Sequence, residues 1–451
     1  MQDDPDHRGV RVDADDGAVL TPPSPAGLPG HDRGALATSG DASAEPILDV
    51  DREAISSCLD RLSDAPAVSD LVSRGLAAGA EVSWDARTLG NGFAGIAYAH
   101  LLLQRGSTGV GSAAHELLSA AIGATKVHPL TSLGLYDGAS GVDRVLAAFA
   151  ARDDRYAAAS VRFRDRVRAS MLEDVRRRPP SHESDIDVIS GRAGWLLHLS
   201  SAAAGGDSSA REVARAVSSD LGAIVRRSSR PIHVLHARTP TRQDTPGEVV
   251  DRLGVAHGAA GILLALSTSV IAEVGDGAVR EQVARLTHEV FAVRVGEGLS
   301  ADETARPGTP AWCTGDAGVD LAVIRAGEAL CDGRLRDHAA ASLLARLERL
   351  APAAPDTAND ASLCHGSAGL LALARAARPY VHPDRWAALH LTLTRRLLRS
   401  FDPDAPLGFS LASHDDPAFL MGAAGALVML GGDDRARGAC TELLTGGAVH
   451  G

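Results

Sequence analysis

Apolar residues recur along the chain in short runs with helical spacing, and each run follows two glycines placed three residues apart. Residues 262–266 and 370–374 are two such runs, both rich in leucine and alanine. Runs of this kind are typical of buried, alanine-rich helices. The Gly-x-x-Gly unit occurs seven times, beginning at Gly92, Gly138, Gly191, Gly258, Gly315, Gly366 and Gly422.

The spacing of these units predicts the fold. It ranges from 46 residues, between the first and second units, to 67, between the third and fourth. This length accommodates one pair of ordinary helices with two loops. The glycines remove side-chain bulk at the first turn of each inner helix and permit a positive φ in the approach loop. We therefore predict an all-α fold, an α/α toroid or double-layered helical barrel of seven helix-pair repeats, each opening with Gly-x-x-Gly.

The residues just before each first glycine should gather at one end of such a barrel. The two cysteines among them lie two positions before their glycines, three other residues lie one position before, and one aspartate lies four before. The set with metal-binding or acid–base side chains is Cys313, Cys364, His365, His257, Asp137 and Asp187.

Cys313, Cys364 and His365 together offer two thiolates and an imidazole. This ligand set leaves the fourth tetrahedral position of Zn²⁺ open, as in catalytic zinc sites. A free thiol is mostly protonated at neutral pH, and binding to zinc deprotonates it. The sequence therefore predicts a zinc cofactor that activates a thiol or a water. His257 is the candidate proton donor, and Asp187 would either orient His257 or help to remove the thiol proton.

Composition supports one large barrel domain over residues 49–451. The chain has 451 residues, of which 45% are hydrophobic but only 3% aromatic, so Ala, Leu and Val fill the core. Residues 1–48 form an acidic and Pro/Gly-rich segment that we expect to be a disordered tail. A loop or small hairpin insertion is expected near 224–250, because residues 231–236 look strand-like and Pro240 and Pro246 break helices.

Charge and cysteine content narrow the class of protein. A net charge of -12 disfavours nucleic acid as a partner. No apolar run is long enough for a transmembrane segment, and the N-terminus lacks the blocks of a signal peptide, so the cytoplasm is the expected location. The odd number of cysteines argues against a disulfide framework. Three of them are expected to be small buried or incidental residues: Cys58, Cys331 and Cys440.

The motifs in their chain order resemble those of the lanthionine synthetase C-like family, which comprises the lanthipeptide cyclases. The resemblance covers roughly residues 80–430 and rests on four units: residues 187–191, 256–258, 312–315 and 364–366. It implies an α/α toroid with catalytic zinc that adds peptide cysteine thiols to dehydroalanine or dehydrobutyrine residues, forming thioether rings. By motif, the zinc ligands of the family correspond to Cys313, Cys364 and His365, and its other active-site residues to His257 and Asp187.

The chain departs from the family pattern at two places. Thr314 follows the first zinc cysteine, where many members have tyrosine, and the arginine often found before the Trp-Cys unit has no counterpart at its offset. Arg306 is the nearest candidate for that arginine. No second catalytic segment is visible outside the barrel, so a stand-alone cyclase is expected. Its partner would be a dehydrated precursor peptide, and a dehydratase is a further candidate partner.

Three functions are compatible with the sequence. The first is the lanthipeptide cyclase of an antibiotic-type biosynthesis. The second is a member of the same family acting on glutathione or on proteins that contain dehydroamino acids. The third is a zinc-stabilised binding scaffold without turnover, which an open coordination position disfavours.

Overall fold

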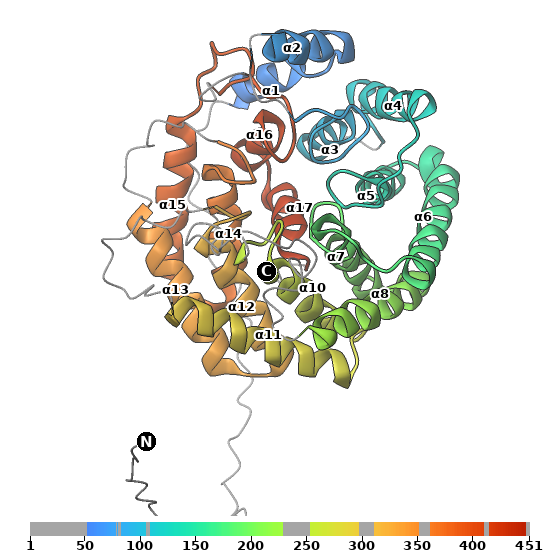
Figure 1. Cartoon of the computed structure of the whole chain (residues 1–451). Coiled ribbons are helices and arrows are strands. Elements are labelled where there is room, and N and C mark those ends of the chain that lie inside the picture. Colours follow the sequence, from blue (N-terminus) through green and yellow to red (C-terminus); the bar gives the residue numbers. More distant parts are fainter. Residues whose placement is uncertain are drawn as a thin grey trace, which may run out of the picture. The chain divides into compact units, whose positions relative to one another are not determined.

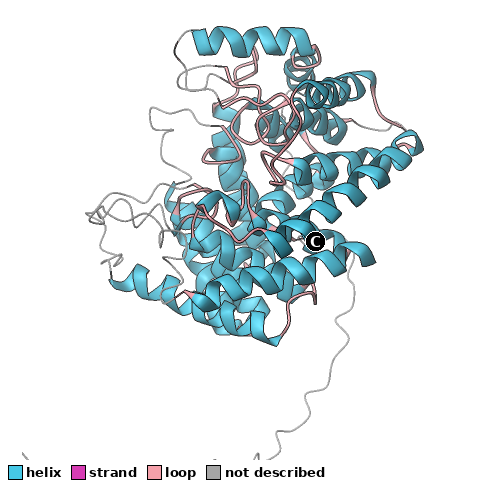
Figure 2. Ribbon diagram, turned by 45° about the vertical axis from the view of Figure 1, so that its right-hand side comes forward, coloured by secondary structure: helices cyan, strands magenta, loops and turns pink. Residues whose placement is uncertain are grey.

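A computed structural model describes residues 52–77, 79, 83–104, 109–228, 253–296, 311–350, 361–409 and 415–447. Within these ranges every regular element is a helix, and the only β-type pairing is one isolated bridge between Phe401 and Phe409 (Figures 1 and 2). The described helices form a ring in two layers around a central axis (Figure 1). The predicted all-α toroid is therefore confirmed.

The inner layer consists of helices that each begin directly after the first glycine of a Gly-x-x-Gly unit. Nearly all their residues are buried, because each helix packs against two inner neighbours and the outer layer. They are α3 (Phe93–Leu103), α5 (Ala139–Ala150), α7 (Arg192–Ala204), α10 (Ala259–Ile271), α12 (Asp316–Leu330), α14 (Ser367–Ala377) and α16 (Ala423–Gly431).

The second glycine of each unit allows the preceding loop to cross its helix at contact distance. A Cβ atom at Gly194 would lie 2.1 Å from the carbonyl oxygen of Val188, and one at Gly318 would lie 2.1 Å from that of Trp312. The other units repeat this approach, at 2.1 to 2.2 Å. None of the motif glycines has a positive φ. The expectation that they permit a positive φ was therefore wrong, and close backbone approach is what demands glycine.

Backbone hydrogen bonds join the loops before the inner helices into a closed circle. Each loop donates an N–H to the carbonyl oxygen of the next loop around the ring, at 2.7 to 3.2 Å. In order, the bonds run from Gly90 to Tyr136, Tyr136 to Ile189, Val188 to Ala256, Ala256 to Cys313, Cys313 to Cys364, Cys364 to Leu420 and Leu420 to Gly90. The circle fixes the residues before the glycines on one rim.

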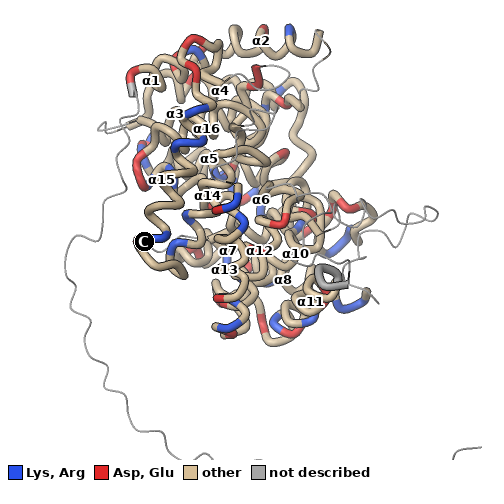
Figure 3. The backbone as a smooth tube through the Cα atoms, turned by 90° about the vertical axis from the view of Figure 1, so that its left-hand side faces the viewer, with Lys and Arg blue, Asp and Glu red and all other residues tan. Residues whose placement is uncertain are grey.

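The outer layer alternates with the inner one along the chain and carries most of the charge. Arg and Glu, for example, mix along α11 (Figure 3). The outer helices are α1 (Arg52–Arg61), α2 (Ala65–Ala77), α4 (Ser112–Val127), α6 (Ala157–Arg177), α8 (Ser208–Arg227), α11 (Gly277–Gly296), α13 (Gly333–Leu350) and α15 (Pro383–Arg399). Among the described connections, 3-10 turns lie at η1 (Asp154–Tyr156), η2 (Glu183–Asp185) and η4 (Arg378–Tyr380).

Helix α17 (Asp434–Thr445) departs from this alternation and lies inside the ring (Figure 1). The Tyr136 hydroxyl donates to the carbonyl oxygen of Leu443 at 2.9 Å, and the Trp312 indole N–H donates to that of Leu444 at 2.9 Å. Glu442 pairs with Arg144 of α5 at 3.3 Å. The end of α17 therefore supports the rim from within, and α1 packs on α16 instead. The count of seven helix pairs stays a prediction.

Three predictions on the chain's organisation concern other segments. The tail at 1–48 lies outside the described residues. Of the insertion expected near 224–250, residues 224–227 belong to α8, which ends at Arg227, and most of the remainder lies outside the described residues. No described helix combines the length and apolar character needed to cross a membrane.

Candidate active site

Cys313 and Cys364 lie on neighbouring loops of the rim and are brought together by the backbone. The Cys313 N–H donates to the Cys364 carbonyl oxygen at 3.2 Å, and the two thiols are hydrogen-bonded to each other. Both side chains are buried, with exposed fractions of 8% and 6%. Two residues 51 positions apart in sequence thus form one thiol pair.

The thiol pair has an unusual protonation behaviour. The hydrogen bond from Cys364 lowers the pKa of Cys313 to about 7, because it stabilises the thiolate. The same contact, together with burial, raises the pKa of Cys364. For comparison, burial alone raises the pKa of Cys440 on α17 to about 12. Cys313 is therefore the more acidic thiol of the pair, and the interior Cys440 is much less acidic.

His365 follows Cys364 on the same loop and is partly buried. Its Nδ1 lies 3.3 Å from the Ser362 hydroxyl oxygen. Burial lowers the pKa of His365, so its imidazole is neutral at pH 7, the form in which histidine binds metals. Among the described residues, no three His, Cys, Asp or Glu side chains form a group that could hold a metal ion. The chemistry of the side chains still fits zinc, since two thiols and a neutral imidazole lie on two neighbouring loops.

His257 and Asp187 form a hydrogen-bonded pair next to the thiols. The His257 Nδ1 lies 2.7 Å from the Asp187 Oδ2, and His257 is 56% exposed while Asp187 is 1% exposed. The hydrogen bond to Asp187 raises the pKa of His257, and the nearby Cys313 adds to this rise. The Ala256 N–H donates to the Cys313 carbonyl oxygen at 3.0 Å, which fixes the two loops side by side.

Asp187 is held rigidly by its own loop. Its Oδ1 accepts backbone N–H bonds from Ser190 at 2.8 Å and Gly191 at 3.0 Å, so only Oδ2 turns to His257. The four-residue offset before Gly191 puts the carboxylate at the start of α7. Such an arrangement orients an imidazole and favours its protonated form.

The remaining sequence candidates occupy other positions. The Thr314 Oγ1 lies 3.9 Å from the Cys313 sulfur, at the edge of a hydrogen bond to sulfur. Arg306 lies outside the described residues. All five cysteines are free. Cys58 and Cys440 are buried as expected, while Cys331 is exposed at the left-handed C-cap of α12.

Sequence reasoning placed Asp137 on the rim but assigned it no role, and it missed Ser190 and Ser132. The Asp137 carboxylate accepts hydrogen bonds from the Ser190 hydroxyl at 2.6 Å and the Ser132 hydroxyl at 3.0 Å. The sequence pointed to Asp137 only through its position directly before Gly138, the first glycine of a Gly-x-x-Gly unit. Ser190 and Ser132 carry no motif of their own, because serine is common in loops.

Comparison with known proteins agrees with this geometry. The family model of the lanthionine synthetase C-like proteins matches residues 83–431. Among solved structures, the fold is similar to that of nisin cyclase, with a TM-score of 0.61 and 16% sequence identity over 84% of this chain and 96% of that one. Comparison with curated protein sequences finds no match. The chain thus belongs to the lanthionine synthetase C-like family.

Proposed function

We propose that this protein is a zinc-dependent lanthipeptide cyclase that adds peptide cysteine thiols to dehydroalanine or dehydrobutyrine residues. The observation that carries the proposal is the meeting, on one rim, of the Cys313–Cys364 thiol pair with the His257–Asp187 pair. A thiol of lowered pKa, Cys313, beside an imidazole of raised pKa, His257, suits addition of a thiolate to an electron-poor alkene. Family membership supports the same reaction class.

Cys313, Cys364 and His365 are the residues that would hold zinc. Zinc, when bound, supplies charge stabilisation for a substrate thiolate at neutral pH. The three residues lie on the rim, near the exposed imidazole of His257. Their burial keeps the sulfur atoms away from solvent and from oxidation.

His257 would manage the proton in the addition. The substrate thiolate forms a bond to the β-carbon, and the π electrons of the alkene move onto the neighbouring carbonyl as an enolate. His257, whose pKa is raised by Asp187, then donates a proton to the α-carbon. The proton lost by the substrate thiol balances the one gained at the α-carbon, so the addition needs no other reactant.

The direct test joins metal content to activity. Purified full-length protein should hold one zinc per chain, and Cys313→Ala, Cys364→Ala or His365→Ala should each lose most of it, because three protein ligands leave no redundancy. Incubation with a dehydrated, cysteine-containing peptide should consume free thiol, followed by alkylation and mass spectrometry. Cys331→Ala is the matched control, since this exposed cysteine lies outside the site, and it should keep both zinc and activity.

The same assay separates the alternatives. Consumption of glutathione in preference to the peptide thiol would favour a family member acting on glutathione. Zinc binding with no thiol consumption from either would favour a scaffold. Full zinc retention in two of the three ligand variants would overturn the ligand assignment.

A further inference from the structure

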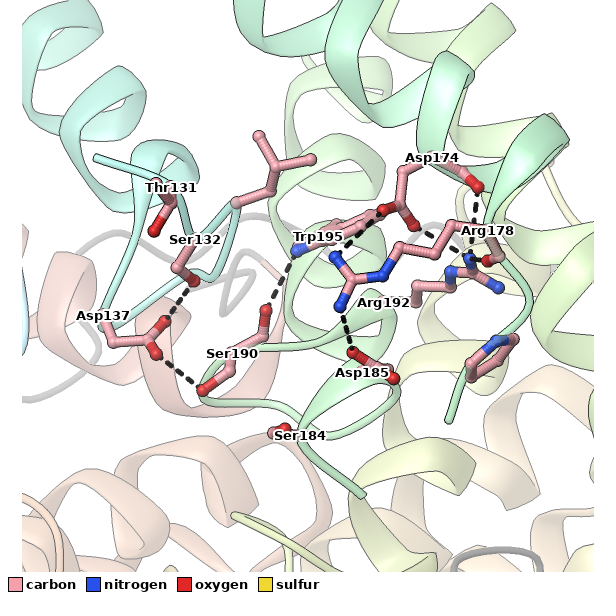
Figure 4. A pocket seen from close by; sticks show the side chains of 12 residues that line it. Thr131, Ser132, Asp137, Asp174, Arg178, Ser184, Asp185, Ser190, Arg192 and Trp195 are labelled. Carbon is pink, nitrogen blue, oxygen red and sulfur yellow. Dashed lines mark hydrogen bonds and ion pairs between the residues drawn. The ribbon is translucent and has the colours of Figure 1, made fainter. Parts of the chain in front are cut away.

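A polar pocket of about 500 Å³ is lined by Ser190, whose backbone N–H donates to Asp187 of the catalytic pair. The loops that lead into α5 and α7 form its walls, together with the end of α6 (Figure 4). Hydroxyl groups, carboxylates and guanidinium groups line it, among them those of Thr131, Asp137, Arg178, Ser184, Ser190 and Arg192. Neither the thiol chemistry nor the proton transfer described above uses this pocket.

Both guanidinium groups of the pocket are paired with carboxylates. Arg192 pairs with Asp174 at 2.9 Å, and Arg178 lies 3.4 Å from Asp185. Asp137 accepts hydrogen bonds from the hydroxyls of two serines. Because the two guanidinium groups are already paired and line the same pocket as Asp137, an uncharged ligand that carries N–H or O–H donors suits the pocket better than an ion.

Asp137 has room for such a ligand. An ionised carboxylate offers about four acceptor sites, and two hydroxyl donors occupy two of them. Burial raises the pKa of Asp137 and the nearby Asp187 carboxylate adds to this rise, so a further donor would stabilise the ionised form of Asp137. Backbone N–H groups of a peptide would supply the missing donors.

The pocket is mechanically joined to the catalytic pair through one serine. The Ser190 hydroxyl donates to Asp137 at 2.6 Å, and the Ser190 backbone N–H donates to Asp187 at 2.8 Å. The two loops are in direct contact, since a Cβ at Gly134 would lie 2.7 Å from the carbonyl oxygen of Ile189. An occupant of the pocket therefore lies against the same loop that aims Asp187 at His257.

We propose that this pocket is a subsite for the substrate peptide, which holds a short, uncharged polar stretch to one side of the reacting cysteine. The ligand class is peptide backbone with hydroxyl or amide side chains. This inference rests on the proposed cyclase function. Binding in this subsite would fix the position of the peptide along the rim while its cysteine thiol reacts beside Cys313.

The geometry of the ring gives an approximate distance between the subsite and the thiols. The pocket loop before α7 is two loops away from the Cys313 loop in the hydrogen-bonded circle. Neighbouring packed helices lie about 8–10 Å apart, and an extended peptide covers about 3.3 Å per residue. About six residues should therefore separate the reacting cysteine from the stretch that enters the pocket.

The test fills the pocket and compares two substrates. Ser184→Trp adds bulk at an exposed residue of the pocket wall that belongs to neither the thiol pair nor the His257–Asp187 pair, and Ser73→Trp on α2 is the matched control. One dehydrated peptide carries ten residues on each side of the reacting cysteine, and the other carries only two. Ser184→Trp should lower the ratio of kcat/KM for the long over the short peptide about tenfold, mainly through KM, as expected for one or two lost hydrogen bonds. Ser73→Trp should leave the ratio at the wild-type value.

A binding measurement accompanies the kinetics. Fluorescein-labelled, undehydrated long peptide should bind Ser184→Trp about tenfold more weakly than wild type in fluorescence anisotropy. An unchanged ratio and an unchanged Kd would overturn the subsite while leaving the cyclase proposal intact. If wild type consumes no thiol from either peptide, the cyclase function itself fails, and the anisotropy result still decides whether the pocket binds peptide.

Discussion

The protein contains two histidine–aspartate pairs with almost the same hydrogen bond and opposite surroundings. His257 and Asp187 lie 2.7 Å apart on the rim, where His257 is 56% exposed. His198 and Asp143 lie 2.9 Å apart inside the ring, where the side chains are 8% and 3% exposed. The first pair borders the thiols, whereas the second lies between α5 and α7.

The difference lies in what each imidazole can reach. His198 is close to the charged group of Glu442 on α17, which Arg144 and the Ser201 hydroxyl hold in place. Two buried atoms of this interior pair, His198 Nδ1 and Asp143 Oδ1, have no hydrogen-bond partner among the described residues. The interior pair is thus sealed from solvent, whereas the exposed imidazole of the rim pair is open to a bound molecule.

The largest expected effect comes from breaking the rim pair at its imidazole. His257→Asn should lower the rate of thiol consumption by ~10²- to 10⁴-fold, the usual loss for a missing general acid. Zinc content should stay at the wild-type level, because Ala256 rather than a cysteine precedes His257 and the residue is assigned no metal contact. Cyclisation at the wild-type rate would refute the catalytic role, and joint loss of zinc would make His257 a ligand.

The interior pair should instead show its effect in stability. His198→Leu leaves the buried Asp143 without its partner and should lower the free energy of unfolding by about 3 kcal/mol or more. His257→Leu, the matched change at the exposed rim, should lower it by less than about 1 kcal/mol. Chemical denaturation of the zinc-loaded proteins, monitored by circular dichroism, measures both. Equal losses in the two variants would remove the distinction between the pairs.

The smallest expected effect is a shift in pH dependence. Asp187 raises the pKa of His257, so the imidazolium persists to higher pH than it would in a free histidine. Asp187→Asn removes this support, and the pKa of His257 should fall. The alkaline limb of the profile of kcat/KM against pH should then move to lower pH, with a smaller loss of rate than in His257→Asn. An unmoved limb would mean that Asp187 acts in another way, such as removal of the thiol proton.

Much of the site could be predicted because the chain repeats a local pattern. The offset of Cys313, Cys364, His257 and Asp187 from their glycines determines the rim on which each residue lies. That inference holds because the second glycine of each unit forces the same loop path across the same helix turn. Two residues with equal offsets therefore reach equal heights on the ring without any knowledge of their contacts.

The sequence by itself thus determined the helical class, the inner layer and the membership of the rim. Only the tertiary structure decided that α17 enters the ring, that Asp137 and Ser190 meet beside a pocket, and that His198 is sealed next to Asp143. The reason is physical. These contacts join side chains from separate repeats whose spacing carries no period, so they depend on how the repeats pack in the closed ring.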